Sequence, residues 1–176
     1  MKNIVSIILI LAFAGLWISC SGDDPKAEEQ VQSHQTSTVD AAKPNVSFQA
    51  LDLDGISHTA DEWIGKKPVV LNFWGTWCPP CRKELPDLIR LYKEYQPKGV
   101  EIIGLAVNDT PDKVRKFSRQ QGIDWVMLMG SNEVALSFGL RGVPMTIFYD
   151  RDGNKVKEFR GLRDYKTLKS GFEAIL

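Results

Sequence analysis

The sequence predicts an α/β domain with a mixed central sheet that is flanked by helices. Segments with the short apolar runs of β-strands alternate with segments whose apolar residues recur at helical spacing. Two of the strand segments, 69–74 and 100–107, are almost continuously apolar, which is typical of central strands covered on both faces. Near its end the chain closes this pattern with a predicted hairpin and a helix.

The predicted domain begins near Val46 and extends to the end of the chain, over residues 46–176. Residues 46–51 alternate between polar and apolar side chains, as a half-buried strand does. The Asp54–Gly55 pair that follows is a hairpin signal. The apolar strand 69–74 comes next along the chain.

After Cys81 the sequence predicts a helix that ends before Pro97, with a kink at Pro86. Its inner face is formed by Leu85, Leu88, Leu91, Tyr92 and Tyr95. The elements predicted beyond it are a strand at 100–107, a helix starting at Thr110–Pro111, a strand at 125–129, a helix at 132–138, strands at 145–149 and 156–160 around Asp152–Gly153, and a helix at 164–176.

The first 45 residues differ from the rest in composition. Residues 1–20 combine an early lysine with an apolar run that is short for a membrane span and ends at Cys20, which predicts an export signal. The end of this signal resembles that of a bacterial lipoprotein, in which the cysteine carries the lipid; an uncleaved anchor or an ordinary signal peptide are the alternatives. Residues 21–45 are polar and predict a flexible tether. The folded domain is therefore expected outside the cytoplasm.

Charge and cysteine content exclude several classes of function. Lys plus Arg and Asp plus Glu both number 22, so no basic surplus indicates nucleic-acid binding. The chain has three cysteines, too few for a disulfide-stapled fold. Cys78 and Cys81 are three positions apart, and a disulfide that closes so small a loop stabilises a fold little. This pair therefore indicates a reactive site and not a structural disulfide.

The Cys78–Pro79–Pro80–Cys81 segment lies where a buried strand is expected to turn into a helix. A cysteine at a helix N-terminus is favoured as a thiolate by the free N–H groups and the helix dipole. We therefore predict Cys78 as the nucleophile and Cys81 as the resolving, more buried thiol. Trp77, with Trp74, offers an apolar surface for an extended partner chain.

At these residues the sequence resembles the thioredoxin family. The matching segments are Asn72–Cys81, Pro86, Gly142–Thr146 and Gly161, and the resemblance extends over roughly 48–176. It implies a cis peptide bond before Pro144 that places the Val143 backbone beside the cysteines. Client contacts are then expected at Trp77, Pro79, Pro80, Val143 and Pro144.

The inserted segment 111–129, the hairpin at 51–55 and the export signal are similar to the TlpA/ResA group of extracytoplasmic thiol reductases. This resemblance implies reduction of disulfides in client proteins, including apocytochromes c during cytochrome c biogenesis in the periplasm. It also implies electron supply by a membrane thiol carrier, with no cofactor beyond the cysteine pair. Asn72 departs from thioredoxin, which has a buried aspartate there. Glu84 matches an acid of the ResA type and is proposed as the proton acceptor for Cys81.

Four other functions could use the cysteine pair: zinc binding, peroxidase activity, disulfide donation or isomerisation, and client binding without turnover. A zinc site needs two further ligands, which the chain does not offer in a suitable pattern. A peroxidase of the related peroxiredoxin type is not expected, because Leu71 stands where that family has proline. A protein-disulfide oxidant or isomerase would use the same residues. A holdase that captures clients without turnover is the alternative from a different class.

Overall fold

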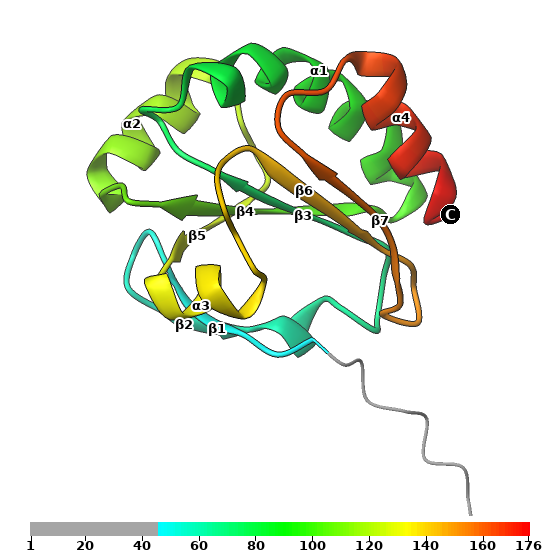
Figure 1. Ribbon diagram of the computed structural model, residues 1–176, viewed down its shortest axis with the longest axis horizontal. Helices are drawn as coiled ribbons and strands as arrows, with labels where there is room; N and C mark the ends of the chain where they lie inside the picture. Colours follow the sequence, from blue (N-terminus) through cyan, green and yellow to red (C-terminus); the bar gives the residue numbers. More distant parts are fainter. Residues whose placement is uncertain (1–45) are drawn as a thin grey trace, which may run out of the picture. The chain divides into compact units, whose positions relative to one another are not determined.

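The computed structural model describes residues 46–176, which belong to one compact unit. Seven strands form a single mixed sheet in the order β2-β1-β5-β4-β3-β6-β7 (Figure 1). The strands are β1 (Gln49–Asp52), β2 (Ser57–Thr59), β3 (Val69–Trp74), β4 (Glu101–Val107), β5 (Val126–Gly130), β6 (Met145–Tyr149) and β7 (Lys155–Arg160). Strands β3, β4 and β5 are parallel, and the remaining neighbours pair antiparallel.

Helices cover both faces of this sheet. They are α1 (Pro79–Tyr95), α2 (Pro111–Gln121), α3 (Asn132–Ser137) and α4 (Tyr165–Ala174), with short 3-10 helices at Ala60–Glu62 and Gln96–Lys98. The long helix α1 lies with α2 and α4 on one face, and the short α3 lies on the other (Figure 1). The α/β sandwich expected from the sequence is thereby confirmed.

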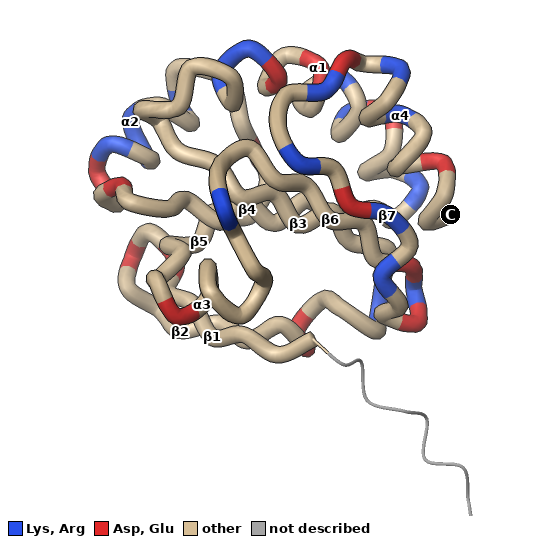
Figure 2. The backbone as a smooth tube through the Cα atoms, viewed as in Figure 1, with Lys and Arg blue, Asp and Glu red and all other residues tan. Residues whose placement is uncertain are grey.

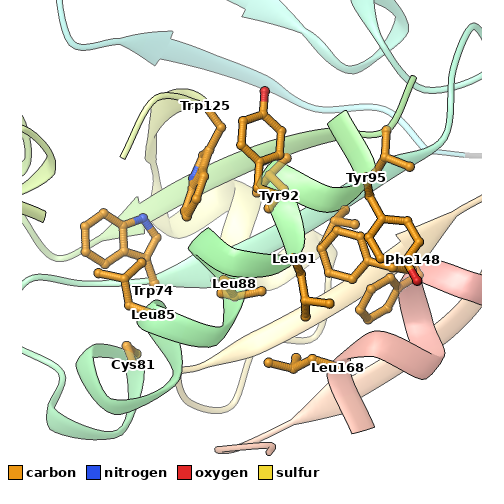
Figure 3. Close-up of a cluster of buried hydrophobic side chains, with 14 of the residues drawn as sticks. Trp74, Cys81, Leu85, Leu88, Leu91, Tyr92, Tyr95, Trp125, Phe148 and Leu168 are labelled. Atoms are coloured by element: carbon orange, nitrogen blue, oxygen red, sulfur yellow. The ribbon is translucent and has the colours of Figure 1, made fainter. Parts of the chain in front are cut away.

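Strand β3 is the centre of the core, and all six of its residues are buried. Its side chains alternate between the two faces, so Val70 and Trp74 pack under α1 whereas Leu71 packs on the opposite side. Figure 3 shows the cluster on the α1 face, with Cys81 and Leu85 at one end of it. Figure 2 shows charged residues on the helices, the turns and the edge strand β7, while β3, β5 and β6 carry none.

Most predicted elements are confirmed to within two residues at their ends. Thr110 occupies the N-cap position of α2 as expected, but its side chain makes no capping hydrogen bond. The 3-10 helix Ala60–Glu62 was not expected; the side chain of Glu62 accepts from the Thr59 backbone N–H and closes a capping box. Within 46–176, none of the helices has the length and apolar character needed to cross a bilayer. The predicted export signal 1–20 and tether 21–45 lie outside the described residues.

Candidate active site

The two cysteines of the domain form a disulfide at the junction of β3 and α1. The Cys78 and Cys81 sulfurs are bonded at 2.06 Å. Cys78 is the N-cap residue of α1, and its backbone is extended there, with φ −90° and ψ 105°. The junction thus places Cys78 Sγ at the positive end of a helix of 17 residues.

Two prolines determine which backbone group reaches that sulfur. Pro79 and Pro80 occupy the first two positions of α1 and have no N–H to donate. The N–H of Cys81 is therefore the first one that the helix offers, and it donates to Cys78 Sγ over 3.2 Å. This hydrogen bond favours negative charge on the sulfur of Cys78.

Burial of the two cysteines differs from the expectation that Cys81 would be the more buried. In the disulfide form Cys78 is 1 % exposed and Cys81 is 5 % exposed, so that prediction is wrong for this redox state. Cys78 is covered because the segment before Pro144 crosses it, with the Val143 carbonyl oxygen 3.7 Å from Cys78 Sγ. The exposed sequence neighbours of the pair are Trp77 (52 %), Pro79 and Arg82.

The loop before Cys78 is attached to the carboxyl end of β4. The Thr76 N–H donates to the Asp109 carboxylate over 2.7 Å, and the Trp77 indole N–H donates to the Val107 carbonyl over 3.0 Å. Sequence reasoning missed Asp109. Its position directly after a central strand was a usable signal, because ligand and active sites of parallel sheets gather at the carboxyl ends of strands.

The segment before β6 contacts the disulfide from the other side. The Val143–Pro144 peptide bond is cis, as the resemblance implied. The Pro144 carbonyl accepts a hydrogen bond from the Gly161 N–H at 2.8 Å. Pro144 is buried and Val143 is half-buried, so the Val143 backbone and the ring of Trp77 are what a chain arriving at Cys78 meets.

Glu84 is a buried acid on the same face of α1 as Cys81, one helical turn further along. The residue is 2 % exposed. Its Oε2 accepts the Arg163 backbone N–H over 2.8 Å, whereas its Oε1 has no hydrogen-bond partner among the described residues. Burial raises the pKa of Glu84 to about 7, and the Arg163 N–H and guanidinium act in the opposite direction. At neutral pH this carboxyl group can therefore take up or release a proton.

Asn72 lies beneath the site, on the face of β3 that packs against α1. Its side-chain amide donates to Thr146 Oγ1 over 2.9 Å, and Asn72 and Thr146 are also partners in the β3–β6 register. Both residues are buried. The position where thioredoxin has an aspartate is thus filled by a neutral, hydrogen-bonded amide that cannot serve as a base.

The structure brings all but one of the expected site residues together. The disulfide, the acid and the expected client contacts lie around the N-terminus of α1: Cys78, Cys81, Glu84, Trp77, Pro79, Pro80, Val143 and Pro144. Cys20, the expected lipid attachment site, lies outside the described residues. The arrangement can exchange a disulfide with an external thiol pair, since one sulfur sits at a helix N-terminus and a buried acid lies beside the other.

Comparison with known proteins agrees with this chemistry. Residues 40–158 match the AhpC/TSA family. The thiol–disulfide oxidoreductase ResA of Bacillus thuringiensis subsp. konkukian is 33 % identical over 138 residues, which cover 78 % of this chain and 79 % of the relative. The protein of the same name from Halalkalibacterium halodurans is 37 % identical over 136 residues, which cover 77 % of each chain.

Solved structures with the same fold come from disulfide-exchange proteins as well. The structure of MTB DsbF in mixed oxidised and reduced forms has a TM-score of 0.66 at 27 % identity and covers 73 % of this chain and 95 % of its own. A thiol:disulfide interchange protein of the thioredoxin family from Chlorobium tepidum has a TM-score of 0.63 at 28 % identity, with coverages of 74 % and 96 %.

Proposed function

This chain belongs to the AhpC/TSA family and is a thiol–disulfide oxidoreductase of the ResA type, and on that premise we propose that it reduces disulfides in partner proteins outside the cytoplasm. The observation that carries the proposal is the place of Cys78 Sγ at the N-terminus of α1, where it accepts the Cys81 N–H over 3.2 Å. This environment stabilises the thiolate, which is the nucleophile of disulfide exchange. Apocytochromes c before haem attachment are the clients that we propose.

In the first step, the Cys78 thiolate attacks one sulfur of the client disulfide. A mixed disulfide forms between Cys78 and the client, and the second client sulfur leaves as a thiolate that takes up a proton. Trp77, Pro79, Pro80, Val143 and Pro144 hold the client chain during this step. Support for their role comes from the exposure of Trp77 and from the closeness of the Val143 carbonyl oxygen to Cys78 Sγ.

In the second step, Cys81 loses its proton and attacks Cys78 Sγ. The Cys78–Cys81 disulfide forms again, and the client leaves with two thiols and two additional electrons. We assign the proton of Cys81 to Glu84, because Glu84 lies one helical turn away and keeps Oε1 free of protein partners among the described residues. A pKa near 7 suits a group that accepts a proton at neutral pH.

Turnover requires that the disulfide be reduced again. We propose a membrane-bound thiol carrier as the electron donor, and a lipid on Cys20 that keeps the domain at the membrane on the periplasmic side. The apolar run of residues 4–18, which Ser19 and Cys20 follow, supports an export signal of the lipoprotein kind. A single lipid chain holds a protein only marginally, so anchoring of this kind takes more than one chain.

Replacement of Cys81 by serine tests the proposal directly. The Cys81→Ser protein, mixed with a client that contains a disulfide, is expected to accumulate a covalent complex that dithiothreitol releases, because the resolving thiol is absent. The variant with both Cys78 and Cys81 replaced by serine is the control and forms no such complex. If the doubly substituted protein retains clients as well as the wild type does, the protein is a holdase and the redox proposal fails.

A further inference from the structure

Two neighbouring hollows lie along α3, and the inner one borders Trp77. The inner hollow, of about 390 Å³, is bounded by Trp77, Leu136, Leu140, Arg141 and Val143. The outer hollow, of about 680 Å³, is bounded by residues 47–51, Asp109, Met129–Gly130 and Glu133. Asn108 and Asn132 line both of them, so the two hollows adjoin each other.

The walls of the inner hollow are mostly apolar, with Asn108, Asn132 and Arg141 as their polar residues. Leu136 is 76 % exposed, which is the highest exposure of any large hydrophobic residue in the described part of the chain, and Trp77 is 52 % exposed. Val134, two positions earlier on α3, is buried, so this short helix packs one apolar side chain inward and presents another outward. Exposed apolar side chains around one hollow are typical of a binding surface.

The inner hollow lies close to the reactive sulfur. Val143 belongs to its wall, and the Val143 carbonyl oxygen lies 3.7 Å from Cys78 Sγ. A client cysteine bonded to Cys78 therefore places its neighbouring residue at the mouth of this hollow. Because the residue next to the cysteine has little freedom in an extended chain, its side chain is the one that the inner hollow receives.

The outer hollow has a different chemical character. It lies where the β1–β5 pairing ends: the register pairs are Leu51–Met129 and Asp52–Leu128, and residues 47–51 and 129–134 line the hollow. The acids Asp109 and Glu133 are part of its wall, and none of the residues that line it is a lysine or an arginine. Its electrostatic potential therefore favours a cationic group.

We infer that the two hollows form one docking groove for an extended client segment, in which an apolar side chain next to the client cysteine enters the inner hollow and a basic side chain farther along lies over the outer hollow. This inference rests on the proposed function and specifies which clients the site selects. The inner hollow contributes binding energy through burial of the apolar side chain, and the outer hollow contributes selectivity through charge.

The test measures the rate at which the full, pre-reduced chain reduces short disulfide peptides in single-turnover reactions. One peptide carries leucine beside its cysteine and lysine several residues away. Two others replace the leucine by serine or the lysine by glutamate. Hydroxyethyl disulfide reaches the sulfur without filling either hollow. Its reduction rate therefore measures disulfide exchange in the absence of groove binding.

The wild-type protein is expected to reduce the leucine–lysine peptide at least about tenfold faster than the serine peptide. Leu136→Asp should abolish that preference, and Glu133→Lys should abolish the preference for lysine over glutamate. Ile56→Asp is the matched control, because Ile56 is also an exposed apolar residue, at 60 %, but borders neither hollow. All three variants should reduce hydroxyethyl disulfide at the wild-type rate.

The docking groove is contradicted if the leucine and serine peptides react at equal rates, or if Leu136→Asp keeps the preference for leucine. Neither result would contradict the exchange activity. Failure to reduce hydroxyethyl disulfide would instead contradict the proposed function itself. If peptide selectivity appears only after residues 21–45 are deleted, the groove binds that segment of the chain and not a client, and the inference is wrong.

Discussion

The Glu84 carboxylate on α1 accepts a hydrogen bond from the Arg163 backbone N–H, 2.8 Å away in the loop that precedes α4. The same loop donates the Gly161 N–H to the Pro144 carbonyl over 2.8 Å. Three consecutive residues thus connect the buried acid with the cis-proline segment beside Cys78. The acid and the client-facing backbone are held by one short piece of chain, which accounts for the fixed position of Glu84 behind the cysteine pair.

The stability of the oxidised protein should fall as Glu84 ionises. Burial raises the pKa of Glu84 from 4.5 to about 7, so the native state binds this proton more tightly than the unfolded state does. The associated stability is fully present below pH 4.5 and is lost as the pH rises through 7. Relative to Glu84→Gln, the wild type should lose roughly 3 kcal/mol of unfolding free energy between these limits.

Urea unfolding of both proteins at pH 4.5, 6 and 8 measures this difference. Comparison with Glu84→Gln removes the contributions of the other groups, since His58 and the carboxylates with lowered pKa values are common to both proteins. A pH-independent difference between the two would show that Glu84 keeps an ordinary pKa in the folded protein.

The resolving step should depend on the same acid. Glu84→Gln removes the proton acceptor proposed for Cys81, so the release of a client from the mixed disulfide should slow by roughly two orders of magnitude at pH 7. The wild-type rate should rise with pH through an inflection near 7 that the variant lacks. Stopped-flow measurement of the second step gives both quantities. Glu94→Gln, a substitution on the outer part of α1, should keep the wild-type profile.

The Asn72–Thr146 hydrogen bond should stabilise the sheet beneath the site. Thr146→Val removes the acceptor and leaves the buried Asn72 amide without its partner, which should cost about 1–3 kcal/mol. Replacing Asn72 by leucine in the same protein should recover part of that loss, because neither polar group is then left unpaired. Chemical denaturation of the single and double variants measures the coupling, and strictly additive losses would argue against the pair.

Gly171 in α4 should resist replacement by alanine. A Cβ at this position would lie 2.4 Å from Cζ of Phe148, and the Phe148 ring is fully buried between Phe159 and Phe172. Helix propensity alone favours alanine by about 1 kcal/mol. Overpacking should outweigh it and destabilise the fold by about 1–3 kcal/mol. Thermal unfolding measures whether Gly171→Ala lowers or raises the stability, with the exposed Glu173→Ala as the control. A stabilised Gly171→Ala protein would contradict the packing described for α4.

The secondary structure could be predicted well because each element carries its own periodicity. Strand β3 at Val69–Trp74 and strand β6 at Met145–Tyr149 agree with the prediction at both ends. The 3-10 helix Ala60–Glu62 was missed, since three residues offer no period to detect. The cis bond before Pro144 and the choice of Glu84 came from family resemblance, because neither has a local sequence signal.

The contacts that hold the site could not be predicted, because they join residues far apart in the chain. The Arg163 N–H that binds Glu84 is a backbone group, and any residue other than proline supplies one at that position. The Asp109 carboxylate that binds the Thr76 N–H depends on the pairing of β3 with β4. The relative burial of the cysteines was wrong for a similar reason, since Cys78 is covered by Val143, which lies in a distant segment of the sequence.

The redox potential of the Cys78–Cys81 pair decides whether the protein reduces client disulfides. The full chain is equilibrated in dithiothreitol and glutathione buffers, and the fraction of dithiol is measured by thiol alkylation, with Cys78→Ser as the control that cannot cycle. A reductant of client disulfides should have a potential near that of thioredoxin, roughly −270 mV. A potential near that of the strong oxidant DsbA, roughly −120 mV, would contradict the account, because the pair would then donate its disulfide to clients instead of reducing theirs.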